Sequence, residues 1–154
     1  MAKNLNHQDS AGTSSCYSGL SANCDALGRL YDWQTARAAC PSGWHLPDTT
    51  ECGKLTTFVG GASVAGTALQ AKIGWSRAGK DTYGFTALPG GFRFGSSFYS
   101  KDSSATWWTS TPWTNTATRS GSRAMLEGMD YQYSNMIVND MDQSYGYSVR
   151  CLKD

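Results

Sequence analysis

The sequence predicts an α+β fold with two short helices in its first half, followed by a mostly antiparallel sheet with long loops. Only 16% of the residues are charged, whereas the chain contains 17 Gly, 6 Trp and 8 Tyr. This composition favours strands and loops over a helical bundle. Apolar residues recur at helical spacing in two early segments, and after these Gly, Ser, Thr and aromatic residues dominate, as is typical of strands and turns.

The first expected helix begins at Asp32, whose side chain can cap the free N–H groups of a first turn. Trp33, Ala36 and Cys40 follow at spacings of three and four residues. Pro41 then prevents the helix from continuing. The pattern therefore predicts one short amphipathic helix.

The second expected helix begins at Asp48, with Glu51 three positions later as in a capping box. Gly60 and Gly61 end it. One face of this helix is apolar and consists of Cys52, Leu55 and Phe58. The remaining elements are expected to be strands, and the candidate segments are 66–73, 84–88, 91–94, 105–110, 124–131 and 148–152.

Length and charge limit the classes of protein and of partner. We expect residues 1–154 to form one domain, which at this length buries about 68–70% of its unfolded surface. The 13 Lys and Arg nearly balance the 12 Asp and Glu, so we expect no nucleic-acid partner. No apolar run approaches the roughly 18 residues of a membrane span. The start MAKNLNHQ has no hydrophobic signal core, and the sequence leaves open whether a leader or another segment precedes it.

The five cysteines lack zinc-site spacing and predict disulfides, and hence an extracellular, cell-surface or virion location. Cys16 and Cys24 flank a short loop, and their bridge would contribute at most about 2.5 kcal/mol. Cys40 ends the first helix and Cys151 lies in the last candidate strand, so their bridge would contribute about 4.7 kcal/mol. Cys52 is left over, and its apolar helix face favours a buried free thiol over a nucleophile.

The last third of the chain has the pattern of a surface that contacts a ligand. WWTSTP at 107–112 is followed by an aromatic and amide-rich run that closes on SYGYSVRC at 144–151. The alternation of polar and apolar residues in this run is typical of a half-buried sheet. The positions expected to point outward are nevertheless occupied by Leu126, Asp130, Tyr133 and Ile137, and not by the Lys and Glu of an ordinary solvated surface. Of two adjacent Trp residues on a strand, one points outward, so we expect Trp108 and Trp113 near Tyr133 to form an aromatic rim.

Several motifs together identify a resemblance to a known family. They are MAKNLN at the start, GRLYDWQTARAACPSGWHLPDTTE at 28–51, AGTALQAKIGW at 65–75, YGFTALPGGFR at 83–93, WWTST and SYGYSVRC. In their order and wording they resemble the Fibrobacter succinogenes major paralogous domain, which is related to C-type lectin and formylglycine-generating-enzyme folds. The resemblance implies a C-type lectin fold, in which a helix-end cysteine pairs with one in the final strand, in agreement with Cys40 and Cys151. Cys52 stands where the family usually has Trp.

Members of this family also resemble the variable proteins of diversity-generating retroelements, in which a reverse transcriptase mutates adenines and rewrites a C-terminal ligand-binding face. Side chains of a strand alternate between its two sides, and from residue 124 onward this alternation places Met125, Met129 and Tyr131 on one side. The other side and the following run give the candidate variable positions Leu126, Gly128, Asp130, Gln132, Tyr133, Asn135, Ile137, Asn139, Asp140, Asp142 and Tyr145. Mutation of an AAC codon at its adenines gives NNC codons, which encode every one of these residues except Gln132. Met141 in the same run also fails this test.

Other interpretations remain beside this one. Late Tyr, Asn and Ser residues also form ordinary turns and solvated edges. Tyr and Trp among small residues suit protein and glycan ligands equally, so a fixed-specificity carbohydrate-binding or adhesion module of a bacterial surface protein is the main alternative. A structural module within an extracellular assembly is the third. The two binding functions imply a protein or glycan partner on a cell or virus surface, whereas the structural module would have no ligand of its own and would pair through the aromatic rim.

We expect no catalysis, no metal and no cofactor. His7 and His45 are the only histidines, and His45, in the motif GWHLP, is expected to have a structural hydrogen-bonding role. The carboxylates of Glu127, Asp130, Asp140 and Asp142 could in principle collect calcium. However, the chain lacks the Glu-Pro-Asn, Gln-Pro-Asp and Trp-Asn-Asp tripeptides of calcium-dependent sugar-binding lectins. Formylglycine-generating enzymes use two late cysteines, whereas this chain has only Cys151 there.

Overall fold

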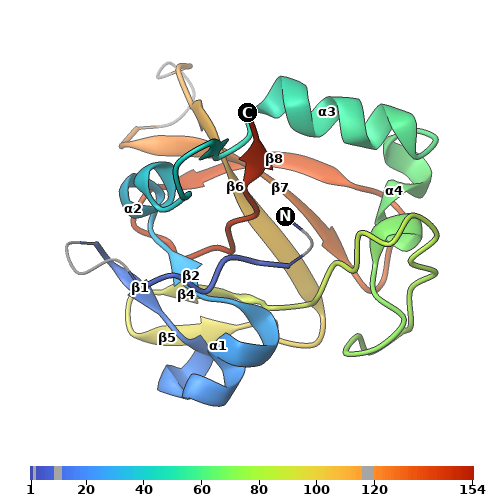
Figure 1. The fold of residues 1–154 in the computed structure, drawn as a ribbon, viewed down its shortest axis with the longest axis horizontal. Helices are drawn as coiled ribbons and strands as arrows, with labels where there is room; N and C mark the ends of the chain where they lie inside the picture. The colour runs from blue at the N-terminus through green and yellow to red at the C-terminus, as the bar shows by residue number, and fades with distance from the viewer. Residues whose placement is uncertain (2, 9–11, 116–119) are drawn as a thin grey trace.

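A computed structural model describes residues 1, 3–8, 12–115 and 120–154. Its centre is a three-stranded antiparallel sheet in the order β6-β7-β8, made of β6 (Ser104–Pro112), β7 (Arg123–Asp130) and β8 (Ile137–Asp142). Smaller two-stranded pairs lie around it, and some of them join segments that are far apart in the sequence (Figure 1). They are β1 (Ser14–Ser15) with β2 (Leu30–Tyr31), β3 (Trp44–His45) with β9 (Leu152–Lys153), and β4 (Phe92–Phe94) with β5 (Ser97–Tyr99). The mixture of helices and antiparallel strands confirms the α+β class.

The helices are α1 (Ser21–Leu27), α2 (Trp33–Ala38), α3 (Thr49–Phe58) and α4 (Ala62–Leu69), with a 3-10 turn at Tyr17–Gly19. The two predicted helices are confirmed as α2 and α3. Asp32 caps α2 by accepting a hydrogen bond from Thr35 N at 2.8 Å. At α3 both halves of the capping box form, since Asp48 Oδ1 accepts from Glu51 N and Glu51 Oε2 accepts from Asp48 N.

Helices α1 and α4 are absent from the prediction, and the strand expected at 66–73 is wrong because α4 occupies its first half. Neither helix has a side-chain cap at its start, so the local signal that marks α2 and α3 is missing. Gly66 in α4 belongs to a close contact, since a Cβ there would lie 2.6 Å from Asn135 O. Tertiary packing against residues 134–135 therefore accounts for a glycine within this helix.

The strands expected at 91–94, 105–110 and 124–131 are confirmed as β4, β6 and β7. Segment 84–88 contributes only one bridge, between Gln70 and Ala87, and of segment 148–152 only the end enters β9. Strand β8 was not predicted. Its sequence IVNDMD contains Asn and Asp, which have low strand propensity, and it is held by pairing with β7.

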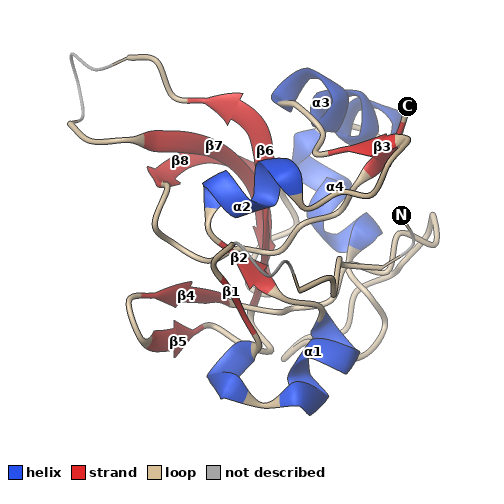
Figure 2. Ribbon diagram, turned by 60° about the vertical axis from the view of Figure 1, so that its left-hand side comes forward, coloured by secondary structure: helices blue, strands red, loops and turns tan. Residues whose placement is uncertain are grey.

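Both faces of strands β6 and β7 are covered, whereas residues 137–139 at the start of β8 are exposed. Trp107 and Trp108 point to opposite faces, as period two requires, but each belongs to a different buried cluster. The cluster around Trp108 includes residues of α2, and the cluster around Trp107 includes residues of α4 and the end of α3. Figure 2 shows α3 and α4 together on one side of β6–β8. The expectation of one solvated face is therefore wrong.

The two predicted disulfides are present and cross-link the chain at very different spans. Cys16–Cys24 has a sequence separation of 8 and Cys40–Cys151 one of 111. Cys52 is free, as predicted. Among the described residues, no helix has the length and apolar character needed to cross a membrane.

Candidate functional site

Two of the predicted contact residues, Trp108 and Leu126, lie in the core. Trp108 is only 1% exposed, and its Nε1–H donates to Tyr31 O at 2.8 Å. Leu126 lies directly opposite Trp108 in the β6–β7 register and is buried in the same cluster. The prediction that these side chains face outward is wrong because α2 and the segments around Tyr31 cover this part of the sheet.

Gly128 and Asp140 are also buried and are not exposed at the surface. A Cβ at Gly128 would lie 2.9 Å from Thr106 Oγ1 on the neighbouring strand. The Asp140 carboxylate pairs with the Arg123 guanidinium, and Arg123 Nη2 also donates to Asp140 O at 2.9 Å. Sterics at Gly128 and the buried ion pair at Asp140 contradict the prediction that these positions form contacts.

The other predicted residues reach the surface to different degrees. Tyr133 is 61% exposed, and Ile137 and Asn139 are exposed as well. Partly buried members are Trp113, Asp130, Asn135, Asp142 and Tyr145. Asp142 Oδ1 accepts hydrogen bonds from Ser144 Oγ and N at 2.7 and 2.9 Å, which lower the pKa of its carboxyl group.

The predicted aromatic rim does not form. Trp113 follows the end of β6 and its backbone N–H bonds to Arg123 O, whereas the Tyr133 N–H bonds to Asp130 O. Arg123 and Asp130 are the two ends of β7, so about 23 Å of strand separates the two aromatic residues. With Trp108 buried, no continuous rim connects them.

An aromatic surface does exist elsewhere, and we call it the aromatic groove. It has a volume of about 380 Å3 and is lined by Phe92, Phe94, Tyr99, Met141, Tyr145 and Tyr147. Phe94, which is 50% exposed, stacks on Tyr145 with ring centroids 4.5 Å apart. Phe92 stacks on Tyr99 at 5.3 Å. Of these residues, only Tyr145 is a contact predicted from the sequence.

The β4–β5 hairpin supplies three of the groove's rings. Phe92 pairs with Tyr99 across the hairpin, so their side chains share a face with Phe94. Gly95 allows the tight turn because its φ is 57°. The alternation in FRFGSSFY was a visible signal for this hairpin, but its proximity to Tyr145 depends on tertiary structure.

The exposed residues of β8 lead toward this groove. Ile137 pairs with Gly128, Asn139 with Leu126 and Met141 with Ala124, so this row lies on the same side of the sheet as Leu126. Met141 lines the groove, and Ile137 lies about 13 Å from it along the strand. We call the aromatic groove together with Ile137 and Asn139 the groove face.

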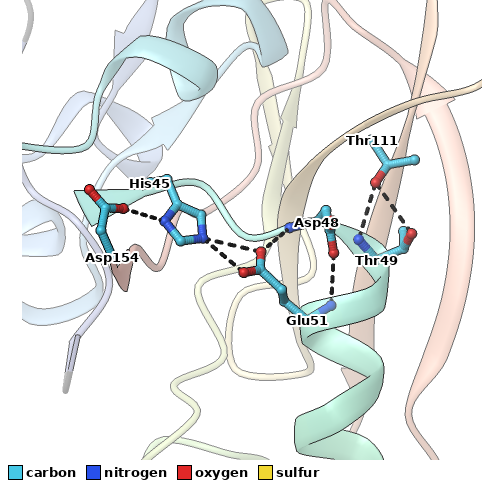
Figure 3. A network of polar contacts seen from close by, with 6 residues as sticks. All are labelled: His45, Asp48, Thr49, Glu51, Thr111 and Asp154. Atoms are coloured by element: carbon cyan, nitrogen blue, oxygen red, sulfur yellow. Dashed lines mark hydrogen bonds and ion pairs between the residues drawn. The ribbon is translucent and has the colours of Figure 1, made fainter. Parts of the chain in front are cut away.

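His45 lies outside the groove face, in a network that joins three parts of the chain (Figure 3). Its Nδ1 lies 2.6 Å from Asp154 Oδ1 and its Nε2 lies 3.0 Å from Glu51 Oε1. Hydrogen bonds to Asp154 and Glu51 raise the pKa of the imidazole. The Glu51 carboxylate also closes the capping box of α3. With a carboxylate on each ring nitrogen, the imidazole has no free nitrogen with which to accept a substrate proton.

The four carboxylates considered for calcium do not form a common site. Within the described ranges, no group of three or more His, Cys, Asp and Glu side chains could hold a metal ion. Asp140 is committed to Arg123, and Glu127 lies opposite Trp107 in the register, on the other face of the sheet from Leu126.

The sequence model of the Fibrobacter succinogenes major domain matches residues 1–153. The chain belongs to this family. No curated protein and no solved structure matches it significantly. The family membership agrees with the resemblance carried by the GWHLP and WWTST motifs, and in this Fibrobacter succinogenes major domain the two motifs lie at β3 and β6.

Proposed function

We propose that this domain recognises a ligand through the groove face and that exposed residues of this face vary between copies of the gene. The observation that carries the proposal is the open aromatic groove beside the exposed row of β8. Rigid aromatic rings provide large contact area at a low cost in side-chain entropy. The proposal includes a C-type lectin fold and a place on the surface of a cell or virion, with which the two disulfides are compatible.

The burial pattern supports a revised set of variable positions. Tyr133, Ile137 and Asn139 are exposed, so their side chains can change without repacking a core. Leu126 and Gly128 are buried, so substitution there would disturb the sheet. We therefore place ligand contacts at the exposed positions and exclude the buried ones.

A fixed-specificity carbohydrate-binding module is the second candidate. Phe94, Tyr99 and Tyr145 present partly exposed rings on one groove, and the faces of such rings can stack on the apolar faces of sugars. In this alternative, Tyr133, Ile137 and Asn139 are the same in sister copies of the gene.

The experiment is a binding screen of the whole chain against a glycan array and a displayed random-peptide library. The test protein is the Phe94→Ala/Tyr145→Ala double variant. The matched control is Phe58→Ala/Tyr83→Ala, which removes another exposed aromatic pair with ring centroids 5.6 Å apart.

We expect the Phe94→Ala/Tyr145→Ala variant to lose at least about 2 kcal/mol of binding free energy, as for the central aromatic of a contact patch. The Phe58→Ala/Tyr83→Ala control should bind as the wild type does. Glycan hits alone favour the carbohydrate-binding module. Equal binding by the wild type and the groove variant contradicts the site assignment.

A further inference from the structure

A mainly apolar cavity of about 290 Å3 lies on the opposite face of the sheet from the groove face, between α3 and strands β6 and β7. Its apolar lining includes Leu55, Phe85, Trp107 and Met136. A cavity of about 150 Å3 is enough to bind benzene. This one therefore has room for an aromatic ring with a short side arm.

One buried carboxylate that lines the cavity has no partner within the described part of the chain. Glu127 is only 6% exposed and lies directly opposite Trp107 in the β6–β7 register, so both side chains project to the α3 side. Among the described residues, the Glu127 carboxylate has no hydrogen bond or ion pair. Buried charges in native proteins are otherwise paired or hydrogen-bonded, and here burial alone raises the pKa of Glu127 to about 7.

The other charged groups on the cavity wall make their hydrogen bonds to groups other than Glu127, although the buried Nε of Arg150 has no hydrogen-bond partner among the described residues. Arg150 donates to Phe85 O at 2.5 Å and to Asn4 Oδ1 at 3.1 Å, and its guanidinium lies 4.1 Å above the Phe85 ring. The Met1 amino group donates to Cys151 O at 2.7 Å. Glu51 is held by His45 and by the N-terminus of α3.

Cys52 brings a thiol to the same cavity. Burial, together with the charges of Glu127, Glu51 and Asp48, raises the pKa of this thiol to about 12, so it stays protonated at neutral pH. Among the described residues that line the cavity, Glu127 is thus the acidic side chain without a cationic partner.

We propose that this cavity binds a small primary amine with an apolar body, whose ammonium group pairs with the Glu127 carboxylate. The aromatic walls support this ligand class because Trp and Phe rings attract cations as well as apolar groups. A charge-assisted hydrogen bond to Glu127 would fix the orientation of the amine, and the apolar body would pack against Leu55 and Met136.

The test uses phenethylamine as the probe and phenethyl alcohol as its uncharged analogue. Binding is followed by the chemical shift of the Trp107 indole N–H in the whole chain, because Trp107 lines the cavity and its N–H donates to Asn4 Oδ1. We expect saturable binding of phenethylamine with a dissociation constant of roughly millimolar order. The alcohol should bind at least about tenfold more weakly, because it lacks the charge that pairs with Glu127.

Glu127→Gln is the matched variant because it keeps the shape of the side chain and removes its charge. It should weaken phenethylamine binding at least about tenfold and leave the alcohol unaffected. Equal phenethylamine affinity in the wild type and Glu127→Gln overturns the proposal, as does the absence of a saturable shift at Trp107.

Cys52 gives a second readout that places the probe. Saturating phenethylamine should change the rate at which this thiol reacts with a disulfide reagent, because the amine covers the thiol and pairs with the Glu127 charge. Cys52→Trp, which puts an indole into the cavity, should abolish binding. Unchanged thiol reactivity or full binding by a folded Cys52→Trp variant overturns the assignment. Because the cavity and the groove face lie on opposite faces of the sheet, either result leaves the proposed function of the groove face to its own test.

Discussion

The ring of Phe94 stacks on the ring of Tyr145, with centroids 4.5 Å apart and planes inclined by 26°. This contact joins the β4–β5 hairpin to the segment that follows β8. Backbone hydrogen bonds from Arg93 N to Gly146 O and from Gly146 N to Arg93 O, each 2.9 Å, hold the two segments together. The groove therefore depends on a backbone bridge and does not depend on the rings alone.

Phe94→Ala should lower the free energy of unfolding by only about 1 kcal/mol, since half of the side chain is already exposed and the lost ring pair contributes about 0.5–1.5 kcal/mol. Urea denaturation measures this loss. Phe58→Ala, which removes a ring that is 74% exposed, is the control and should cost no more. A loss above about 3 kcal/mol would show that Phe94 is a core residue.

Gly128→Ala should destabilise the protein by about 1–3 kcal/mol, because the added methyl group meets Thr106 and the backbone of Ala105 across the strand pair. Tyr133→Ala, at an exposed position, should change stability by no more than about 0.5 kcal/mol. Equilibrium unfolding of both variants gives the comparison. A stable Gly128→Ala protein would restore position 128 as a candidate for variation.

Removal of the long-range disulfide should cost more than removal of the local one. By the chain-entropy estimate, the Cys40→Ala/Cys151→Ala variant loses about 4.7 kcal/mol and the Cys16→Ala/Cys24→Ala variant about 2.5 kcal/mol. The difference arises because the separations are 111 and 8 residues. Denaturant titration of the two double variants checks the order, and equal losses would refute the entropic explanation.

Glu127 should make the fold less stable as the pH rises. Its pKa increases from 4.5 to about 7 on folding, so the folded state retains a proton that the unfolded state releases. The corresponding stability is fully present below pH 4.5 and is lost as the pH rises through about 7, by an amount of the order of 3 kcal/mol. The wild type minus Glu127→Gln difference in unfolding free energy, measured from pH 4 to 8, should fall accordingly. Parallel curves for the two proteins would contradict this.

His45 should also stabilise the fold preferentially at low pH. Its pKa is raised by Asp154 and Glu51, so the contribution is fully present below the unfolded value of 6.5 and is lost as the pH rises through the folded value. The melting temperature of the wild type minus that of His45→Gln should therefore shrink from pH 6 toward pH 8. A difference that grows with pH would have the wrong sign.

Local signals in the sequence predicted much of the fold. The caps at Asp32 and Asp48 located α2 and α3 because a cap is a short-range interaction. The alternation around Trp107 located β6, and it correctly placed Trp107 and Trp108 on opposite faces. Periodicity does not say what covers each face, however, so Trp108, Leu126 and Gly128 were assigned to the wrong environment.

The site was less predictable because its parts are distant in sequence. Tyr145 was predicted as a contact because it lies in the aromatic and amide-rich run near the C-terminus. Phe94 and Tyr99, however, become its neighbours only through the β4–β5 hairpin. The cavity had one sequence signal, the single acidic residue Glu127 within AMLEGM. From the sequence, Glu127 was a possible calcium ligand, whereas the register places it beside Trp107 under α3.

The most direct test of a diversified groove face is to sequence the DNA that flanks the gene. We predict a near-copy of the segment encoding residues 107–151 beside a reverse transcriptase gene, differing chiefly at adenines. The changed codons should include Tyr133, Ile137 and Asn139 and should spare Leu126 and Gly128, which are buried. The absence of any near-copy, or changes at the buried codons, would contradict diversification of the groove face.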